Sequence, residues 1–219
     1  MEKIQKSRNP SWTIIFWALV ISLSYAILRY HILGPVPWKD LPFFILNKGN
    51  ALSAFILLTI NFSLGPLQKL GLPIPNQWLK SRKMLGIMGF LQAFVHVIMS
   101  FILLRPSIYE KFFAPDETLT LFTGLSLIGG ITAFIFLWIY NISFNMELRK
   151  DKDLISFITS RNVTLFAIFM AGTHLFFMGF EGWLKPEGWH GGLPPISLVG
   201  FVFFIIGFVI NLLGRADRE

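Results

Sequence analysis

The sequence predicts an all-α integral membrane protein, a six-transmembrane-helix bundle with both termini in the cytoplasm. Hydrophobic residues make up 54% of the 219 residues and charged residues only 14%, whereas about a quarter of a typical soluble domain is charged. The hydrophobic residues fall into six runs, each close to the roughly 20 residues that cross a bilayer as a helix. The basic residues lie mainly between alternate runs, which sets the orientation.

Each of the six apolar runs is interpreted as one transmembrane helix. They cover about residues 12–30, 49–67, 84–104, 119–143, 163–182 and 195–213. The first run ends in Arg29, Tyr30 and His31 without a small-residue cleavage site, so we expect a retained helix and not a signal peptide. No repeat or soluble segment interrupts the pattern, so residues 1–219 are predicted to form a single domain.

Lysine and arginine are divided unequally between the two predicted sides. With the N-terminus inside, 13 of the 19 basic residues fall on the cytoplasmic side, so the positive-inside rule places both termini there. The cytoplasmic set is Lys3, Lys6, Arg8, Lys69, Lys80, Arg82, Lys83, Arg149, Lys150, Lys152, Arg161, Arg215 and Arg218. The other 6 are Arg29, Lys39, Lys48, Arg105, Lys111 and Lys185. The expected location is a bacterial inner membrane.

Because the basic residues are spread among short connectors, the net charge of +7 does not indicate nucleic-acid binding.

The connector between the fourth and fifth runs, MELRKDKDLISFITSRN, is the most charged segment of the chain. We interpret it as a solvated cytoplasmic connector. Docking of a partner protein or a nucleotide is the alternative.

Two of the four histidines lie within predicted spans, where ionisable groups are costly and usually mark function. His96 lies about 12 residues into the third run and His174 about 11 residues into the fifth, and both helices run outward. At about 1.5 Å per residue, both histidines are expected roughly 17–18 Å from the inner boundary. The sequence therefore predicts that they share one depth.

Two imidazoles at one depth are what a bis-histidine haem requires, because the iron takes one nitrogen from each side. The neighbours of His96 at helical spacing are small, and they include Gly89 and Ala93. Ala171 is a small neighbour of His174 at helical spacing. These small side chains are expected to leave room for a flat macrocycle, with the two histidines as axial ligands of the haem iron.

The two histidines are also compatible with roles that need no haem. Small residues let transmembrane helices pack closely, and a lone histidine can hydrogen-bond to a neighbouring helix. The pair could form a proton path or bind a bare metal ion, although no nearby carboxylate or cysteine completes a ligand set. The alternative functions are a haem-free scaffold subunit of a larger membrane complex and a transporter with a histidine relay; against the latter, only Glu181, at the edge of a span, is acidic.

Two consecutive segments, KGNALSAFILLTINFSLGPL and SRKMLGIMGFLQAFVHVIMSF, resemble the ferric reductase-like transmembrane family, which includes the haem subunit of a bacterial periplasmic methionine sulfoxide reductase. The family pattern opens with Gly-x-Ala-Leu, ends its first helix in Pro-Leu, and continues through Arg-Arg-x-Leu-Gly to a haem histidine. The matching positions are Gly49, Ala51, Leu52, Pro66, Leu67, Arg82, Lys83, Leu85, Gly86 and His96. Lys83 replaces the second arginine, and His174 fits the second ligand. The likeness covers about residues 45–182.

The resemblance implies one haem b and not two. Many members carry a further histidine 13 or 14 residues before an outer ligand, but these places hold Lys83 and Arg82 before His96, and position 13 before His174 is Arg161. The arrangement is similar to the single-haem six-helix metalloreductases, in which a flavin bridges the cytoplasmic donor and the haem. A flavin (FMN or FAD) or a quinone is therefore expected between donor and haem.

Four basic residues at the predicted inner boundary are expected to bind this carrier or the haem. Arg82, Lys83 and Arg161, with Lys80, would hold a flavin phosphate or haem propionates through charge-assisted hydrogen bonds. Plain anchoring at the inner membrane surface is the alternative.

The resemblance implies an electron-transfer component of an oxidoreductase system, which passes electrons across the bilayer to a periplasmic acceptor or partner reductase. No G-x-G-x-x-G fingerprint occurs and the chain stops soon after the last run, so we expect a separate flavin reductase or a quinol as donor. On the outer side, His31 and His190 could line the exit or bind an acceptor metal, and Glu181 could lie beside the haem edge. Positions at the water boundary are the alternative for all three.

Overall fold

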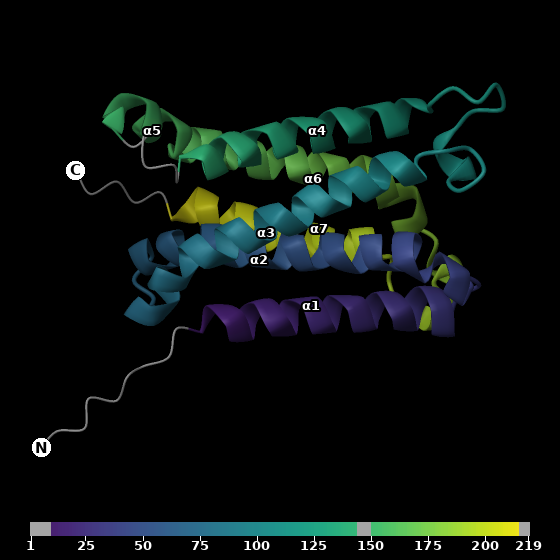
Figure 1. Cartoon of the computed structure of the whole chain (residues 1–219), viewed down its shortest axis with the longest axis horizontal. Coiled ribbons are helices and arrows are strands. Elements are labelled where there is room, and N and C mark those ends of the chain that lie inside the picture. The colour runs from purple at the N-terminus through teal and green to yellow at the C-terminus, as the bar shows by residue number, and fades with distance from the viewer. Residues whose placement is uncertain (1–9, 144–149, 215–219) are drawn as a thin grey trace, which may run out of the picture.

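Six long helices lie side by side along one direction and form a bundle (Figure 1). The computed structural model describes residues 10–143 and 150–214, in which the only β pairing is an isolated bridge between Phe113 and Leu119. All six helices are long and apolar enough to cross a membrane. The prediction of an all-α protein with six membrane-length helices is therefore confirmed. Six residues of the predicted cytoplasmic set lie outside the described residues: Lys3, Lys6, Arg8, Arg149, Arg215 and Arg218.

Six of the helices make up the bundle. They are α1 (Ser11–Ile27), α2 (Leu46–Lys69), α3 (Asn76–Leu103), α4 (Leu121–Ile142), α6 (Arg161–Trp183) and α7 (Ile196–Leu213). Two π-helical turns lie between α1 and α2: η1 (Leu28–Ile32) continues α1, and η3 (Leu41–Ile45) leads into α2.

The helix ends differ from the apolar runs where polar residues remain helical. The third run was expected from about residue 84, but α3 begins at Asn76, directly after Pro75. Proline disfavours the α conformation in the residue before it, so the helix starts there and not at the edge of the apolar run. Hydropathy detects the part of a helix that lies in lipid and not its full length.

The charged connector before α6 contains a short helix, α5 (Lys152–Ile158). The Asp151 side chain caps it by accepting a hydrogen bond from the backbone N–H of Leu154. Ser160 then caps α6 by accepting from the N–H of Val163. Each cap satisfies one of the free N–H groups at a helix start, so the described part of this connector contains helix, and most of its residues are exposed.

The helices pack unevenly around the bundle. α2 lies at the centre, against α1, α3 and α7, while α6 packs against both α4 and α7. The approach of α4 to α6 needs glycine: a Cβ on Gly129 would lie 2.9 Å from both the backbone nitrogen of His174 and the backbone oxygen of Met170. In contrast, α3 meets α4 over far fewer residues than it meets α2. This looser region leaves room for a cavity.

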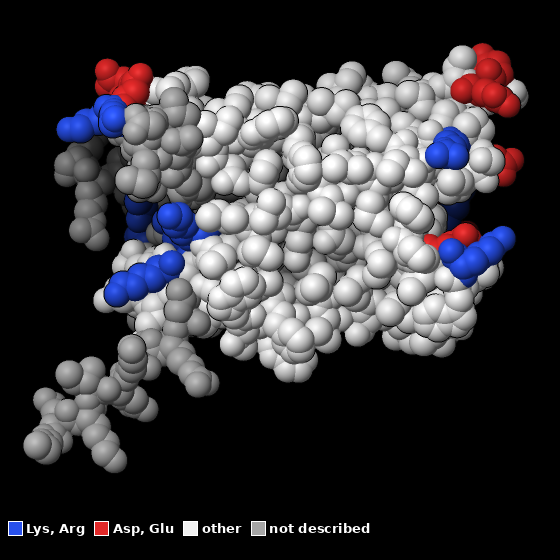
Figure 2. Space-filling view, in the orientation of Figure 1, with Lys and Arg blue, Asp and Glu red and all other residues white. Residues whose placement is uncertain are grey.

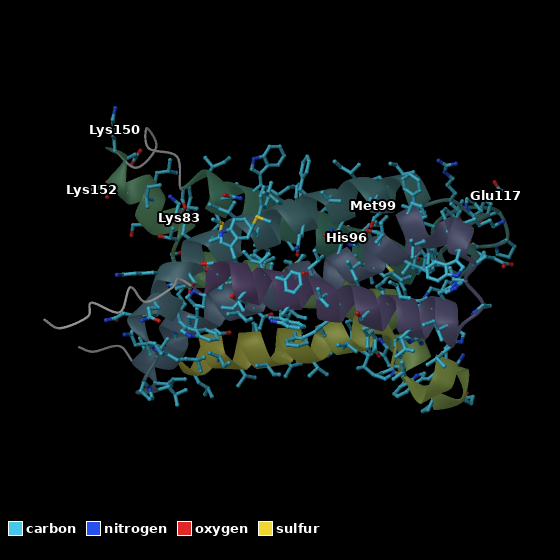
Figure 3. The ribbon with its side chains drawn as sticks, turned by 60° about the horizontal axis from the view of Figure 1, so that its bottom comes forward. Lys83, His96, Met99, Glu117, Lys150 and Lys152 are labelled. Carbon is cyan, nitrogen blue, oxygen red and sulfur yellow. The ribbon has the colours of Figure 1, made fainter. Side chains whose placement is uncertain are left out.

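Charged side chains lie at the two ends of the bundle, and the band between them is free of charge on the face in Figure 2. The first and last described residues, Pro10 and Gly214, lie at one end, here called the terminal end, together with Lys83 and Lys152 (Figures 1 and 3). Glu117 marks the opposite end, here called the Glu117 end, and His96 lies between the two, nearer Glu117 (Figure 3). This distribution is typical of a bundle that spans a bilayer.

The close approach of α4 to α6 predicts opposite effects for two glycines of one helix. Gly129→Ala should destabilise the protein, because the new methyl group meets the backbone of α6, whereas Gly124 has no atom within 4 Å of its ideal Cβ. Gly124→Ala should therefore be neutral or stabilising, by up to about 1 kcal/mol from helix propensity. Thermal unfolding of both variants in detergent measures the difference. Equal melting temperatures would contradict this packing of α4 on α6.

Candidate functional site

A cavity of about 830 Å³ runs through the loosely packed part of the bundle. Residues from α2, α3, α4, α6 and α7 line it, and both His96 and His174 are among them. Ala93 of α3 and Ala171 of α6, two of the predicted small residues, also line it. The volume lies within the range of roughly 300–1,000 Å³ that is usual for small-molecule and cofactor sites.

The two histidines, one from α3 and one from α6, face each other across this cavity. Their ring centroids are 6.4 Å apart, and the ring planes are inclined by 67°. The structure thus brings together two residues that are 78 positions apart in the chain (174 − 96).

His96 is held by a polar group from the start of α2. Its Nδ1 lies 2.7 Å from the side-chain oxygen of Asn47 and 3.3 Å from the Ser100 hydroxyl. The amide nitrogen of Asn47 in turn donates to Ser100 Oγ over 3.1 Å. Because the Asn47 oxygen can only accept, the proton of His96 belongs on Nδ1.

His174 is held by Ser126 of α4 in a comparable way. Its Nδ1 lies 3.0 Å from the backbone oxygen of Ser126 and 3.0 Å from Ser126 Oγ. The Ser126 hydroxyl donates to the backbone oxygen of His174 over 2.9 Å. The hydroxyl proton is therefore used, and Nδ1 of His174 donates to the Ser126 carbonyl.

These contacts leave the Nε2 atom of each ring with a free lone pair. No hydrogen bond reaches either Nε2 atom from the described residues. An imidazole that donates through Nδ1 to a carbonyl and offers Nε2 is the usual form of a metal-bound histidine, because the donated hydrogen bond fixes the tautomer and the ring orientation.

The spacing of the two rings suits one metal centre between them. An imidazole ring with bonds of about 1.33 Å has a radius of about 1.1 Å, and a metal–imidazole bond of about 2 Å then puts two opposed ring centroids about 6 Å apart. The observed separation is 6.4 Å. Across the described residues, no group of three or more His, Cys, Asp or Glu side chains is placed to hold a metal ion. Two ligands from the protein suit a metal whose other ligands come from a macrocycle better than they suit a bare ion.

The small residues near the histidines have two different roles. A Cβ on Gly130 would lie 2.8 Å from His174 Nδ1, so this glycine makes room for the imidazole itself. Gly89 does not line the cavity; a Cβ there would lie 2.9 Å from the Leu58 side chain, so Gly89 permits α3 to pack on α2.

The basic residues predicted to bind a carrier or propionates lie away from the cavity, toward the terminal end. Arg82 donates through Nε to the backbone oxygen of Asn61 over 3.2 Å. Arg161 donates to the backbone oxygens of Asn211 and Leu212, each over 3.3 Å. Lys83 is exposed at the terminal end (Figure 3). The two arginines therefore hold α2 and α7 by their backbone oxygens, and none of the three lines the cavity.

Four cationic residues of the described chain also line the cavity. The sequence assigned them to the outer side of the membrane but predicted no role for them in a site. These are Arg29, Lys48, Lys111 and Lys185. The sequence did not point to Asn47, Ser126 or Gly130 either. One signal was present in the polar pair Asn47 and Lys48 just before the second apolar run, because such residues at a membrane boundary need partners inside the protein.

The remaining outer residues are not part of the cavity wall. His31 lies with Nδ1 2.7 Å from the backbone oxygen of Val36, and its ring stacks on Trp38 with centroids 3.7 Å apart. His190 contacts the turn at Gly34, where a Cβ would lie 3.1 Å from its ring. Glu181 is exposed near the end of α6.

No protein-family model matches this chain, and no curated protein does either. The function of the site is therefore inferred from its geometry.

The hydrogen bonds at Nδ1 predict the tautomer of both buried histidines. In ligand-free protein, ¹⁵N NMR of the four imidazoles should show His96 and His174 as the Nδ1–H form. Asn47→Leu removes the acceptor and should shift the signals of His96 alone, with those of His174 serving as the internal control. An Nε2–H form in the wild-type protein would show that the rings are not oriented as described.

Proposed function

We propose that this chain is a membrane haem b protein that carries electrons across the bilayer. The observation that supports this most directly is the pair of Nδ1-anchored imidazoles that line one cavity, with ring centroids 6.4 Å apart. The sequence resemblance to ferric reductase-like membrane proteins points in the same direction. When bound, the haem would supply reversible one-electron chemistry between its ferric and ferrous states.

The residues of the chain would bind and orient the cofactor. His96 and His174 would be its axial ligands, and Ala93 and Ala171 leave space for its faces. Asn47 and Ser126 hold the two rings in place and keep the protons on Nδ1. With two histidine ligands, the metal would have no position open to a substrate, which would favour electron transfer over substrate binding.

A single haem is proposed, because His31 and His190 lie outside the cavity wall and the chain has only four histidines. The donor would be a separate flavin reductase or a quinol, with FMN, FAD or a quinone as the intermediate carrier. The exposed Lys83 and Lys152 at the terminal end favour docking of an acidic donor protein there (Figure 3). The acceptor would be a periplasmic molecule or partner reductase.

The haem proposal predicts the absorption spectrum of the purified protein. Protein expressed with ample haem should show sharp reduced-minus-oxidised bands, which both His96→Gly and His174→Gly abolish by removing one axial ligand. His31→Ala and His190→Ala are matched controls and should keep the spectrum, because neither residue lines the cavity.

Added imidazole separates loss of the ligand from loss of the fold. It should restore haem binding to each glycine variant by occupying the space of the missing ring. A colourless wild-type protein would contradict the proposal. If such a protein co-purified with a partner even after loss of both histidines, the haem-free scaffold function would be favoured instead.

The orientation that we propose puts both termini in the cytoplasm of a bacterial cell, with the chain in its inner membrane. The chain contains no cysteine, so single substitutions can be labelled selectively. Glu117→Cys should react with a membrane-impermeant maleimide on spheroplasts, whereas Lys83→Cys, at the opposite end, should react only after permeabilisation (Figure 3). The reverse pattern would invert the topology and with it the direction of electron flow.

A further inference from the structure

The cavity ends in a polar chamber toward the Glu117 end of the bundle. We call this chamber the vestibule and define it by Arg29, Lys48 and Lys111 with the rings of Tyr30 and Tyr109, all of which line the cavity. Its members come from η1, from the first turn of α2, and from the loop between α3 and α4. Segments distant in sequence thus place three cations around one opening.

Lys48 is held in the vestibule by aromatic rings and not by an acid. Its ammonium nitrogen lies 5.0 Å from the ring centroid of Tyr30, 4.6 Å from that of Phe44 and 5.4 Å from that of Tyr109. Such contacts stabilise a cation without neutralising it. No carboxylate of the described residues forms a salt bridge with Lys48, so no acid of the protein occupies its nitrogen.

Arg29 is held in place by hydrogen bonds to the backbone just before α7. It is only 4% exposed, and its Nε donates to the backbone oxygens of Leu193 and Pro194 over 3.1 and 2.8 Å. Its guanidinium carbon lies 4.8 Å from the ring centroid of Tyr30. The π-helical turn η1 carries both residues, and π turns inside helices are frequent at functional sites.

The charges of the vestibule do not cancel among themselves. Lys111 is exposed as a residue, but the protein around its ammonium group partly desolvates it and lowers its pKa, while Glu181 raises the pKa and Arg29 lowers it. Glu110 is the only acidic residue on the described cavity wall. Desolvated cations without a paired anion are costly, and a bound anion would offset this cost.

We propose that the vestibule binds the carboxylate groups of a ligand whose apolar body lies deeper in the cavity. The fixed guanidinium of Arg29 and the ammonium of Lys48 would each form a charge-assisted hydrogen bond with a carboxylate. Two sources share this chemistry: the propionates of the haem, in which case the inference rests on the proposed function, and a separate soluble carboxylate at the outer mouth.

The first measurement compares haem with its dimethyl ester, in which both carboxylates are blocked. If the vestibule binds propionates, apoprotein should bind haem at least about tenfold more tightly than the ester, since one charge-assisted hydrogen bond accounts for about a factor of ten. Lys48→Met and Arg29→Gln should reduce this preference. The exposed Lys39→Met and Arg105→Gln are matched controls that lie off the cavity wall and should retain it.

The second measurement titrates citrate against the wild-type protein and the same four variants, with thermal stability as the readout. Stabilisation of wild type but not of Lys48→Met or Arg29→Gln, without any preference for haem over its ester, supports a soluble carboxylate as the occupant. If neither porphyrin binds, the proposed function fails, and the citrate titration alone then tests whether the vestibule binds carboxylates. No preference for haem and no response to citrate together overturn the inference.

Discussion

The site depends on the need of every buried polar group for a partner in a medium that supplies no water. An imidazole in the middle of a bilayer is tolerated only if its N–H is bonded within the protein. Asn47 and the Ser126 carbonyl meet this need for His96 and His174. The same two bonds that let the fold accommodate the histidines also fix the orientation of their rings, so the stability of the fold and the placement of the rings have one origin.

The packing of the bundle follows from where small residues allow close contact and where they leave space. Gly129 brings α4 onto α6 and Gly89 brings α3 onto α2, so each pair is tight. Between the pairs, Ala93 and Ala171 are too short to fill the gap. Glycine and alanine thus have different roles within one bundle, since the two glycines let neighbouring helices approach closely and the two alanines line the cavity.

Much of the fold was predictable because a bilayer imposes a simple length and polarity requirement on each helix. The proximity of His96 and His174 agrees with the count of residues along two helices that run in the same direction. The hydrogen-bond partners of the two histidines could not be predicted in this way, because the rotation of one helix about its axis relative to the next is set by packing and not by hydropathy. Arg82 and Arg161 show the same limit: the sequence predicts that they lie near helix ends, but not that they donate to backbone oxygens of other helices. The vestibule was missed because π-helical turns have no clear sequence signal.

Asn47 and Lys48 are consecutive residues with different tasks, the first holding His96 and the second lying in the vestibule. Both lie within three residues of the end of the π-helical turn Leu41–Ile45. A π turn contains one residue more than the α-helical pattern would use, and a shift of one residue would rotate the start of α2 by about 100°. The extra residue therefore acts as a spacer that sets the rotational register of both side chains. In homologous chains, a deletion within residues 41–45 should be rare unless a second deletion or a rebuilt turn restores that register.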